Sequence, residues 1–369
     1  MTVALLLVGY GHVARRFVRL LDESRGALDA LDVHPVVVGI ATRRHGAAFD
    51  PSGLDETSIA SLDRPGAGAP AGSGPGIGDR RGEDPGATAA ASPGPPPIDE
   101  WIARLGTVDA DVRVLVETTT LDVLTGEPAI SHVRAGLRAG VHVVTANKGP
   151  VAVAWRALAD EAARAGVSFL FEGAVMDGIP VFNLVRETLP ACEVRGFRGV
   201  VNSTTNYILD ALEQGEAFDA ALTRMQQAGV AEADASLDVD GWDAAAKAAA
   251  LANVLMDARI TPAGVAREGL GPDTAARAIR ARRDGRVLKL VASAMRAADG
   301  RVAARVALET LPPADPLAIL EGQANAIELD TWPAGRIVIT QRDGGLEKTA
   351  YAILSDLITV VRRVRAGHA

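Results

Sequence analysis

Two lysines stand out among the residues that could transfer a proton. Only four of the 38 basic residues are lysines, and arginine supplies the rest of the positive charge. Lys148 lies in the segment TANKGP, and Lys247 ends the segment DVDGWDAAAK. The scarcity of lysine by itself also fits a genome rich in GC. However, a lysine can give up its proton at working pH and an arginine cannot, so both lysines are candidate acid–base groups.

Carboxylates are concentrated next to Lys247. Asp243 precedes it by four residues, which places both side chains on one face of a helix, where they can pair. Asp238 and Glu232 lie further upstream. An ordinary surface ion pair is the alternative interpretation, but the four other acidic residues in the preceding dozen positions weigh against it. Two lysines with several carboxylates suit a small zwitterionic amino acid whose hydroxyl must lose a proton. One of the lysines would then need a lowered pKa, through burial and the second ammonium.

The other two lysines and the single cysteine are expected to be passive. Lys289 is predicted to extend from a strand toward solvent, and Lys348 to face solvent near the start of the last helix. Cys192 lies outside any triad-like context, so a thiol nucleophile is not expected. One cysteine excludes an intramolecular disulfide, and the six scattered histidines show no zinc-type spacing.

Composition narrows the class of protein. The 369 residues are 48% hydrophobic and carry a net charge of −8, which argues against a nucleic-acid partner. No apolar run reaches the roughly 20 residues that a membrane span needs. The N-terminal segment MTVALLLVGYGH lacks a basic region and turns into glycines, so it is read as a strand rather than a signal peptide. The chain is predicted to be soluble and cytoplasmic.

Apolar runs alternate with helical patterns in the first half. Strands are predicted at 2–8, 36–41 and in the segments DVRVLVETT, GVHVVTANK and GVSFLFEG, with helices between them. Continuous apolar strands are typical of a parallel sheet that is covered on both faces, which predicts an α/β fold with a doubly wound sheet. Residues 64–97 interrupt this order with glycine, proline and alanine, and are predicted to form a disordered insertion. After Pro180 the pattern changes to a mixture of α and β elements that ends in an amphipathic helix at about 346–364.

The first strand leads into a phosphate-binding turn. Gly9, Gly11 and Ala14 form the G-x-G-x-x-G/A pattern, and the amides of His12 and Val13 would begin the following helix. The second strand ends in Ala-Thr-Arg-Arg, with Arg43 and Arg44 where an NAD-selective site usually has an acidic residue. NADP is therefore the preferred prediction and NAD the second, although two solvated arginines would look the same.

The sequence resembles the homoserine dehydrogenase family. The matching segments span almost the whole chain outside 64–97: GYGHVA, TANKGP, FEGAVMDGIPVFNL, VNSTTNYIL, AEADASLDVDGWDAAAK and GGLEKTAYAILSDL. The resemblance implies NAD(P)-dependent interconversion of L-homoserine and L-aspartate 4-semialdehyde, in the biosynthesis of threonine, methionine and isoleucine. It also implies a Rossmann-type domain (1–175) completed by a C-terminal segment (342–369), and a substrate-binding domain (176–341) that forms a homodimer.

The resemblance also assigns roles to single residues. Lys148 and Lys247 match the family's active-site lysines, and Lys148 also matches a cofactor contact. Expected substrate contacts are Glu232, Asp238, Asp243 and Thr204. Further expected cofactor contacts are Thr118, Thr119 and Gly345. A loop that holds a monovalent cation, Na⁺ or K⁺, largely through backbone carbonyls, matches Glu172, Val175, Asp177 and Ile179.

Some positions depart from the family pattern. Ser203 stands where the family usually has glycine, and Asp177 where it has a small residue. They motivate the alternative of an NAD(P)-dependent oxidoreductase acting on another small amino or hydroxy acid. A non-catalytic cofactor-binding regulator is a weaker alternative, because such a protein has no need for the lysines. The chain ends after its last predicted helix, so the regulatory domain of longer members and threonine feedback through it are not expected.

Overall fold

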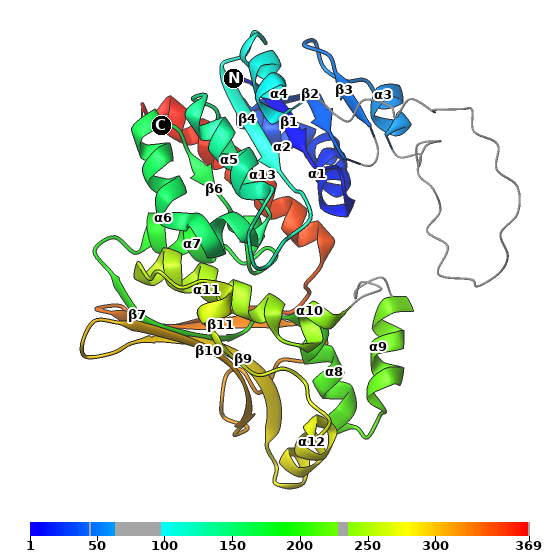
Figure 1. Cartoon of the computed structure of the whole chain (residues 1–369), viewed down its shortest axis with the longest axis vertical. Coiled ribbons are helices and arrows are strands. Elements are labelled where there is room, and N and C mark those ends of the chain that lie inside the picture. Colours follow the sequence, from blue (N-terminus) through cyan, green and yellow to red (C-terminus); the bar gives the residue numbers. More distant parts are fainter. Residues whose placement is uncertain (44–45, 63–96, 228–234, 368–369) are drawn as a thin grey trace, which may run out of the picture.

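The computed structural model describes residues 1–43, 46–62, 97–227 and 235–367, which form two six-stranded sheets with helices around each (Figure 1). The strands of the first sheet are β1 (Thr2–Val8), β2 (His34–Ala41), β3 (Ala47–Phe49), β4 (Val112–Glu117), β5 (His142–Thr145) and β6 (Phe169–Leu170). The helices of this half are α1 (His12–Glu23), α2 (Arg25–Ala30), α3 (Glu56–Ser61), α4 (Ile98–Gly106), α5 (Ala129–Arg138), α6 (Lys148–Ala165) and α13 (Leu346–Arg365).

The first sheet has the strand order β3-β2-β1-β4-β5-β6 and is parallel except for the edge strand β3. Side chains of β1 alternate between two apolar clusters, with Leu5 and Leu7 in one and Leu6 in the other. Because both faces are covered, the strand needs apolar residues at successive positions rather than at every second one. The predicted α/β, doubly wound fold class is confirmed.

Helices from distant parts of the chain cover the two faces of this sheet. Phe17 of α1 and Ile353 of α13 lie in the same cluster as Leu5. Trp101 of α4 and Leu137 of α5 lie in the cluster that contains Leu6. The last helix of the chain therefore packs in the same layer as the first and contacts it directly.

The second sheet has the order β12-β11-β7-β9-β10-β8 and is antiparallel except for the pair of β8 and β10. Its strands are β7 (Glu193–Val200), β8 (Ala266–Arg267), β9 (Val287–Arg296), β10 (Val302–Leu311), β11 (Asn325–Trp332) and β12 (Gly335–Gln341). The helices of this half are α7 (Val181–Asn183), α8 (Ser203–Glu213), α9 (Phe218–Gln227), α10 (Ser236–Val239), α11 (Trp242–Met256) and α12 (Thr274–Arg283).

Helix α11 lies between the two halves (Figure 1). It contacts α6 of the first half and strands β9 and β10 of the second. Its alanines, including Ala245 and Ala249, are fully buried, and such small side chains allow the helix to approach both neighbours closely. The Asn253 amide donates to the Ala152 carbonyl at 3.1 Å and so links α11 directly to α6.

The longer elements lie where apolar periodicity predicts them, whereas several short ones were not predicted. Strand β3 and helices α2 and α3 have between three and six residues, too few to show a period. Residues 64–96 of the predicted insertion lie outside the described residues, and Pro97 is the N-cap of α4. In the part of the chain that the structure describes, no helix has the length and apolar character that crossing a membrane requires.

Candidate active site

The turn after β1 has the geometry of a dinucleotide-binding loop. Gly9 has a φ of +92°, and a Cβ there would lie 2.7 Å from the carbonyl of Thr118, so only glycine fits. A Cβ at Gly11 would meet nothing within 4 Å, which leaves open space in front of α1. The first turn of α1 begins at His12 and directs its free amides toward that space. These residues fit a bound pyrophosphate.

The end of β2 provides the residues nearest to the expected ribose position. Thr42 is buried and its hydroxyl donates to the Gly46 carbonyl at 2.9 Å. Arg43 follows it and is exposed. Arg44, the second predicted cofactor contact here, lies outside the described residues.

The carboxyl ends of β4 and β5 lie side by side and carry the next group of predicted residues. Glu117 is paired in register with Thr145, and the Thr118 hydroxyl donates to the Gly9 carbonyl at 3.0 Å. Lys148 is the first residue of α6, whose N-cap is Asn147. The loops after β1, β4 and β5 therefore meet at one edge of the sheet, where ligands of open α/β sheets bind.

Asp243 brings the two predicted catalytic lysines together. Lys148 Nζ lies 3.1 Å from Asp243 Oδ1, and Lys247 Nζ lies 3.0 Å from Asp243 Oδ2. The predicted pairing of Asp243 and Lys247 on one helix face is confirmed, because both lie in α11. Lys247 also donates to the Val201 carbonyl at 2.7 Å. One carboxylate thus joins an ammonium from each half of the molecule.

Asn202, which sequence analysis did not select, organises the carboxylates. Its amide Nδ2 donates to Asp238 Oδ1 at 2.7 Å and to Asp243 Oδ2 at 2.9 Å. Its Oδ1 accepts from the amide of Thr205 at 2.8 Å and so caps α8. The signal was available, since asparagine before a helical segment is a typical N-cap. Thr204, a predicted substrate contact, is the second residue of α8 and is buried.

The charges of this cluster shift the pKa values of its members in opposite directions. Burial raises the pKa of Asp238, and the nearby Asp243 carboxylate adds to this effect. Burial alone would also raise the pKa of Asp243, but Lys148 and Lys247 together lower it far below its ordinary value. Asp243 is therefore a carboxylate anion at neutral pH.

Lys247 does not have the lowered pKa that the sequence analysis expected of one of the two lysines. Burial works against its charged form, but the carboxylates of Asp243, Asp177 and Asp238 raise its pKa above the ordinary value. The prediction considered burial and the second ammonium, and it did not include Asp177, which is distant in sequence. Lys247 is accordingly a stable ammonium at neutral pH.

Asp177 links the loop after β6 to both halves of the molecule. Its carboxylate accepts from the backbone amide of Gly345 at 3.1 Å and from the hydroxyl of Thr349 at 3.3 Å. It also accepts from the side-chain amide of Asn325 at 3.3 Å. Asn325 also donates to the Ser203 hydroxyl at 3.1 Å. The two departures from the family pattern, Asp177 and Ser203, therefore belong to one hydrogen-bond network.

The predicted cation loop offers its backbone rather than its side chains. Both carboxylate oxygens of Glu172 accept backbone amides, from Phe182 at 2.8 Å and Asn183 at 2.7 Å. The Asp177 carboxylate faces Gly345. The Ile179 carbonyl already accepts from Val181 at 2.8 Å. A cation here would depend on the remaining carbonyl lone pairs. Among the described residues, no group of three or more His, Cys, Asp and Glu side chains could hold a metal ion.

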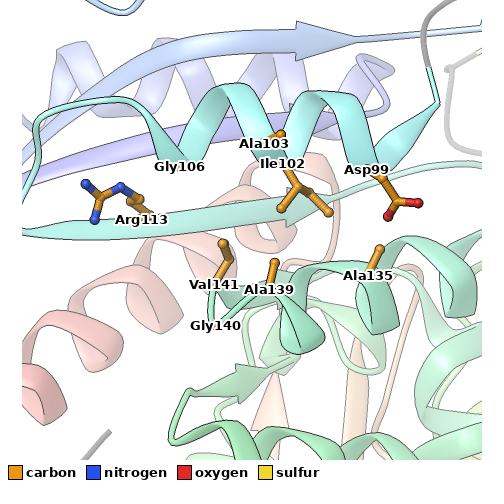
Figure 2. Close-up of a pocket in the computed structure, with 9 residues that line it drawn as sticks. All are labelled: Asp99, Ile102, Ala103, Gly106, Arg113, Ala135, Ala139, Gly140 and Val141. Atoms are coloured by element: carbon orange, nitrogen blue, oxygen red, sulfur yellow. The ribbon is translucent and has the colours of Figure 1, made fainter.

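Glu232, the expected partner of the substrate ammonium, lies outside the described residues. A groove of about 510 Å³ between α4 and α5 does not belong to this site (Figure 2). It is lined at one end by Arg113, at the start of β4, and by Val141, just before β5. The groove runs from there along α4 to Asp99 and does not include Lys148 or any other predicted site residue.

Two family models together match nearly the whole chain. One is described as the NAD binding domain of homoserine dehydrogenase and matches residues 9–172. The other is described as homoserine dehydrogenase and matches residues 180–358. The boundary between them falls in the loop that contains Asp177.

Relatives and solved structures agree with these models. The NAD(+)-dependent homoserine dehydrogenase of Pseudomonas canavaninivorans is 34% identical over 96% of this chain and 95% of its own length. The homoserine dehydrogenase of Methanocaldococcus jannaschii is 37% identical over 69% of this chain and 73% of its own. The crystal structure of a putative homoserine dehydrogenase from Archaeoglobus fulgidus superposes with a TM-score of 0.77 at 28% identity, covering 98% of this chain and 99% of that one. With sequence and fold in agreement over its length, the chain belongs to the homoserine dehydrogenase family of oxidoreductases.

Proposed function

We propose that Lys148 and Lys247 carry the proton transfer by which this chain interconverts L-homoserine and L-aspartate 4-semialdehyde. The observation that supports it is the pair of ammonium groups on the two oxygens of Asp243, at 3.1 and 3.0 Å. The lysines come from different halves of the chain and meet beside a nucleotide-binding edge. Two fixed positive charges suit the substrate oxygen, which becomes negative as hydride reaches the aldehyde carbon and, in the reverse direction, as the hydroxyl loses its proton.

The raised pKa of Lys247 suits a general acid. In the reductive direction, a protonated Lys247 donates a proton to the aldehyde oxygen as it becomes an alcohol, while Lys148 supplies a second positive charge. In the oxidative direction the same nitrogen must first lose a proton to accept one from the hydroxyl of homoserine. Asp243 holds both nitrogens in place and stabilises the charged form of Lys247.

The surrounding residues are assigned to substrate and cofactor. Asp238 and Thr204, with Glu232, would bind the amino-acid part of the substrate. Bound NAD(P) supplies the hydride donor or acceptor. Its phosphates would lie at the amides of the α1 turn, and its remaining contacts would come from the neighbouring loops; the proposed residues are Gly9, Gly11, His12, Val13, Thr118, Thr119, Lys148 and Gly345.

Substitution of each lysine tests the assignment. Lys148→Ala and Lys247→Ala should each lower kcat by at least about 10²-fold, because a general acid or base contributes 10²- to 10⁴-fold. Binding of NADPH, followed by its fluorescence, should change much less. Lys247→Arg should also fail, since arginine keeps its proton. Arg156→Ala is the matched control, because Arg156 pairs with Asp257 and joins the same two helices through an exposed contact. Wild-type turnover in either alanine variant would refute the proposal.

For the cofactor, we propose a preference for NADP over NAD. The support is the exposed Arg43 at the end of β2, where the described residues offer no carboxylate to a ribose hydroxyl. The relative from P. canavaninivorans is named as NAD(+)-dependent, so both cofactors must be assayed. Arg43→Ala should reduce kcat/KM for NADP by about 10-fold, the loss of one charge-assisted contact, and leave NAD unaffected. A preference of the wild-type enzyme for NAD would refute the proposed preference for NADP.

A monovalent cation is a further proposal for the loop of Glu172, Val175, Asp177 and Ile179. Its support is the short, irregular segment between the 3₁₀ turn at Glu172–Ala174 and α7, where the carboxylates of Glu172 and Asp177 already accept backbone amides and carbonyl oxygens would be the ligands. Replacing Na⁺ or K⁺ by a bulky organic cation at constant ionic strength should lower activity or thermal stability. If neither activity nor thermal stability changes, the proposed cation site is refuted.

The remaining proposals concern the whole chain. We assign residues 1–175 and 342–369 to a cofactor domain and residues 176–341 to a substrate domain. We also propose a homodimer formed through the face of the second sheet that α8, α11 and α12 leave uncovered. A cytoplasmic location stays a prediction from the sequence.

A further inference from the structure

A fully buried carboxylate at the end of β4 takes no part in the mechanism above. Glu117 ends β4 and its side chain has no exposed surface. Its Oε1 accepts from the amide of Thr119 at 2.8 Å and from the Thr119 hydroxyl. Its Oε2 accepts from the hydroxyl of Thr145 at 2.7 Å. Glu117 therefore fixes the ends of two neighbouring strands with its two oxygens.

A continuous series of hydrogen bonds leads from Glu117 to Asn147, the N-cap of the helix that begins with Lys148. The Thr145 hydroxyl, which donates to Glu117, accepts from the backbone amide of Asn147 at 3.0 Å. Asn147 accepts from Gly149 at 2.9 Å and so caps the helix that begins with Lys148. The Asn147 amide group also donates to the Thr119 carbonyl at 3.0 Å, which closes the network.

Burying the carboxylate of Glu117 costs free energy that an apolar side chain at the same position would not cost. Transfer of a carboxylate out of water is unfavourable unless hydrogen bonds replace the lost hydration. Burial raises the pKa of Glu117 to about 7, and the bonds from Thr119 and Thr145 hold it below the value that burial alone would give. An apolar residue would pack at the end of this apolar strand without that cost.

We propose that Glu117 is a positioning residue of the reaction, which acts through Thr145 and Asn147 to hold Lys148 against Asp243. The inference rests on the catalytic role proposed for Lys148. A fixed start of α6 would help to hold Lys148, whose ammonium pairs with Asp243 from a different part of the chain. A displacement of about 1 Å at a reacting group can cost 10²-fold in rate.

A double-mutant cycle distinguishes positioning from stability. Glu117→Gln, which keeps the volume but can accept with only one oxygen, should lower kcat by 10- to 100-fold in an otherwise wild-type chain. In the Lys148→Ala background the same change should have almost no further effect on kcat, because the group that it positions is gone. Glu161→Gln is the control. Glu161 lies on α6, the helix that begins with Lys148, and pairs with Arg134 and Arg138, so its substitution should not change kcat.

A second pair of variants tests the connection without touching the buried carboxylate. Thr145→Val removes the hydroxyl that joins Glu117 to Asn147, and should reduce kcat by a similar factor. Thr145→Ser retains the hydroxyl and should restore kcat to near the wild-type value. The pair decides the question if Glu117→Gln does not fold or if the Lys148→Ala enzyme is too slow to measure.

Two results would overturn the inference. One is an equal fall in kcat from Glu117→Gln with and without Lys148, which would mean a general structural effect. The other is wild-type kcat in Thr145→Val. A wild-type rate in Lys148→Ala alone would instead refute the proposed function, so the two failures are distinguishable.

Discussion

Lys247 is surrounded by more negative charge than its own helix provides. Asp243 is on α11, but Asp177 comes from the loop after β6 and Asp238 from α10, and all three stabilise the ammonium. Lys148 faces the same carboxylate from α6 and opposes this effect by adding positive charge. The balance favours a protonated Lys247, which makes reduction of an aldehyde the direction that needs no prior loss of a proton.

This balance predicts the pH dependence of both reactions. Oxidation of homoserine needs neutral Lys247, so its kcat should rise with pH into the alkaline range, whereas reduction should persist across neutral pH and fall as Lys247 deprotonates. Asp177→Asn removes one carboxylate, lowers the pKa of Lys247 and should shift the rising limb of oxidation to lower pH. Rate profiles of the two directions check this. If the kcat of oxidation still rises with pH near neutrality in Lys247→Ala, the acid–base group would be Lys148 and not Lys247.

The sequence predicts a contact between two side chains when the two residues lie close together along the chain. Asp243 and Lys247 are four residues apart, and the helix between them brings them together. Lys289 shows the limit: it was expected to reach solvent, but it is 1% exposed and donates to Asn206, Asp210 and the Leu320 carbonyl. Its partners lie more than 30 residues away, so no local pattern shows that they enclose it. The roles of Glu117 and Asn202 depend on contacts of the same distant kind.

At the scale of elements, the sequence predicts the long strands and helices well because each has a regular apolar pattern. The connections that carry the site are less regular. The segment from Glu172 to Asn183 contains a short 3₁₀ turn, a residue with φ of +50° at Asp177 and the first turn of α7. Its conformation depends on Asp356 of α13, whose carboxylate accepts the Glu172 amide at 2.7 Å. A helix from the far end of the chain thus shapes this loop.

The loop also predicts a pH-dependent stability. Burial, with the nearby Asp356 carboxylate, raises the pKa of Glu172 from 4.5 to about 8 in the folded chain. Between these values the folded state binds a proton that the unfolded state does not, so the free energy of unfolding should fall as pH rises. The stabilisation is complete below about pH 4.5 and lost above about pH 8, with a slope of at most about 1.4 kcal/mol per pH unit.

Urea denaturation at pH 6, 7 and 8 measures this slope. Glu117, whose pKa burial raises to about 7, and Asp356, whose pKa burial raises to about 6, add to the slope up to those pH values. Glu172→Gln should therefore flatten the curve chiefly between pH 7 and 8, although it lowers the absolute stability because glutamine accepts only one of the two amides. A variant whose stability falls between pH 7 and 8 as steeply as that of the wild type would contradict the assignment to Glu172.

At the scale of the whole molecule, the two sheets differ in how their second face is covered. Both faces of the parallel sheet are covered by helices. In the second sheet, Leu290 and Ala292 of β9 face the helices, whereas Ser293 and Met295 line an open groove with Gly196, Arg198 and Arg305. Carboxylates and arginines alternate there, as in the ion pairs of Arg198 with Asp315 and Glu328. A surface with both signs of charge and small residues at its centre can pack against a copy of itself.

Met295 gives the sharpest test of this dimer. It is 56% exposed, so Met295→Arg should leave the folded chain intact while adding a charge to the groove of the open face. A twofold contact brings the patch against its own copy, so the change acts twice in each dimer. Sedimentation velocity should show a dimer for the wild type and a monomer for Met295→Arg, with unchanged circular dichroism. Leu124→Arg, equally exposed but in the first half of the chain, should remain dimeric. A monomeric wild type, or a dimer that survives Met295→Arg, would exclude this face as the interface.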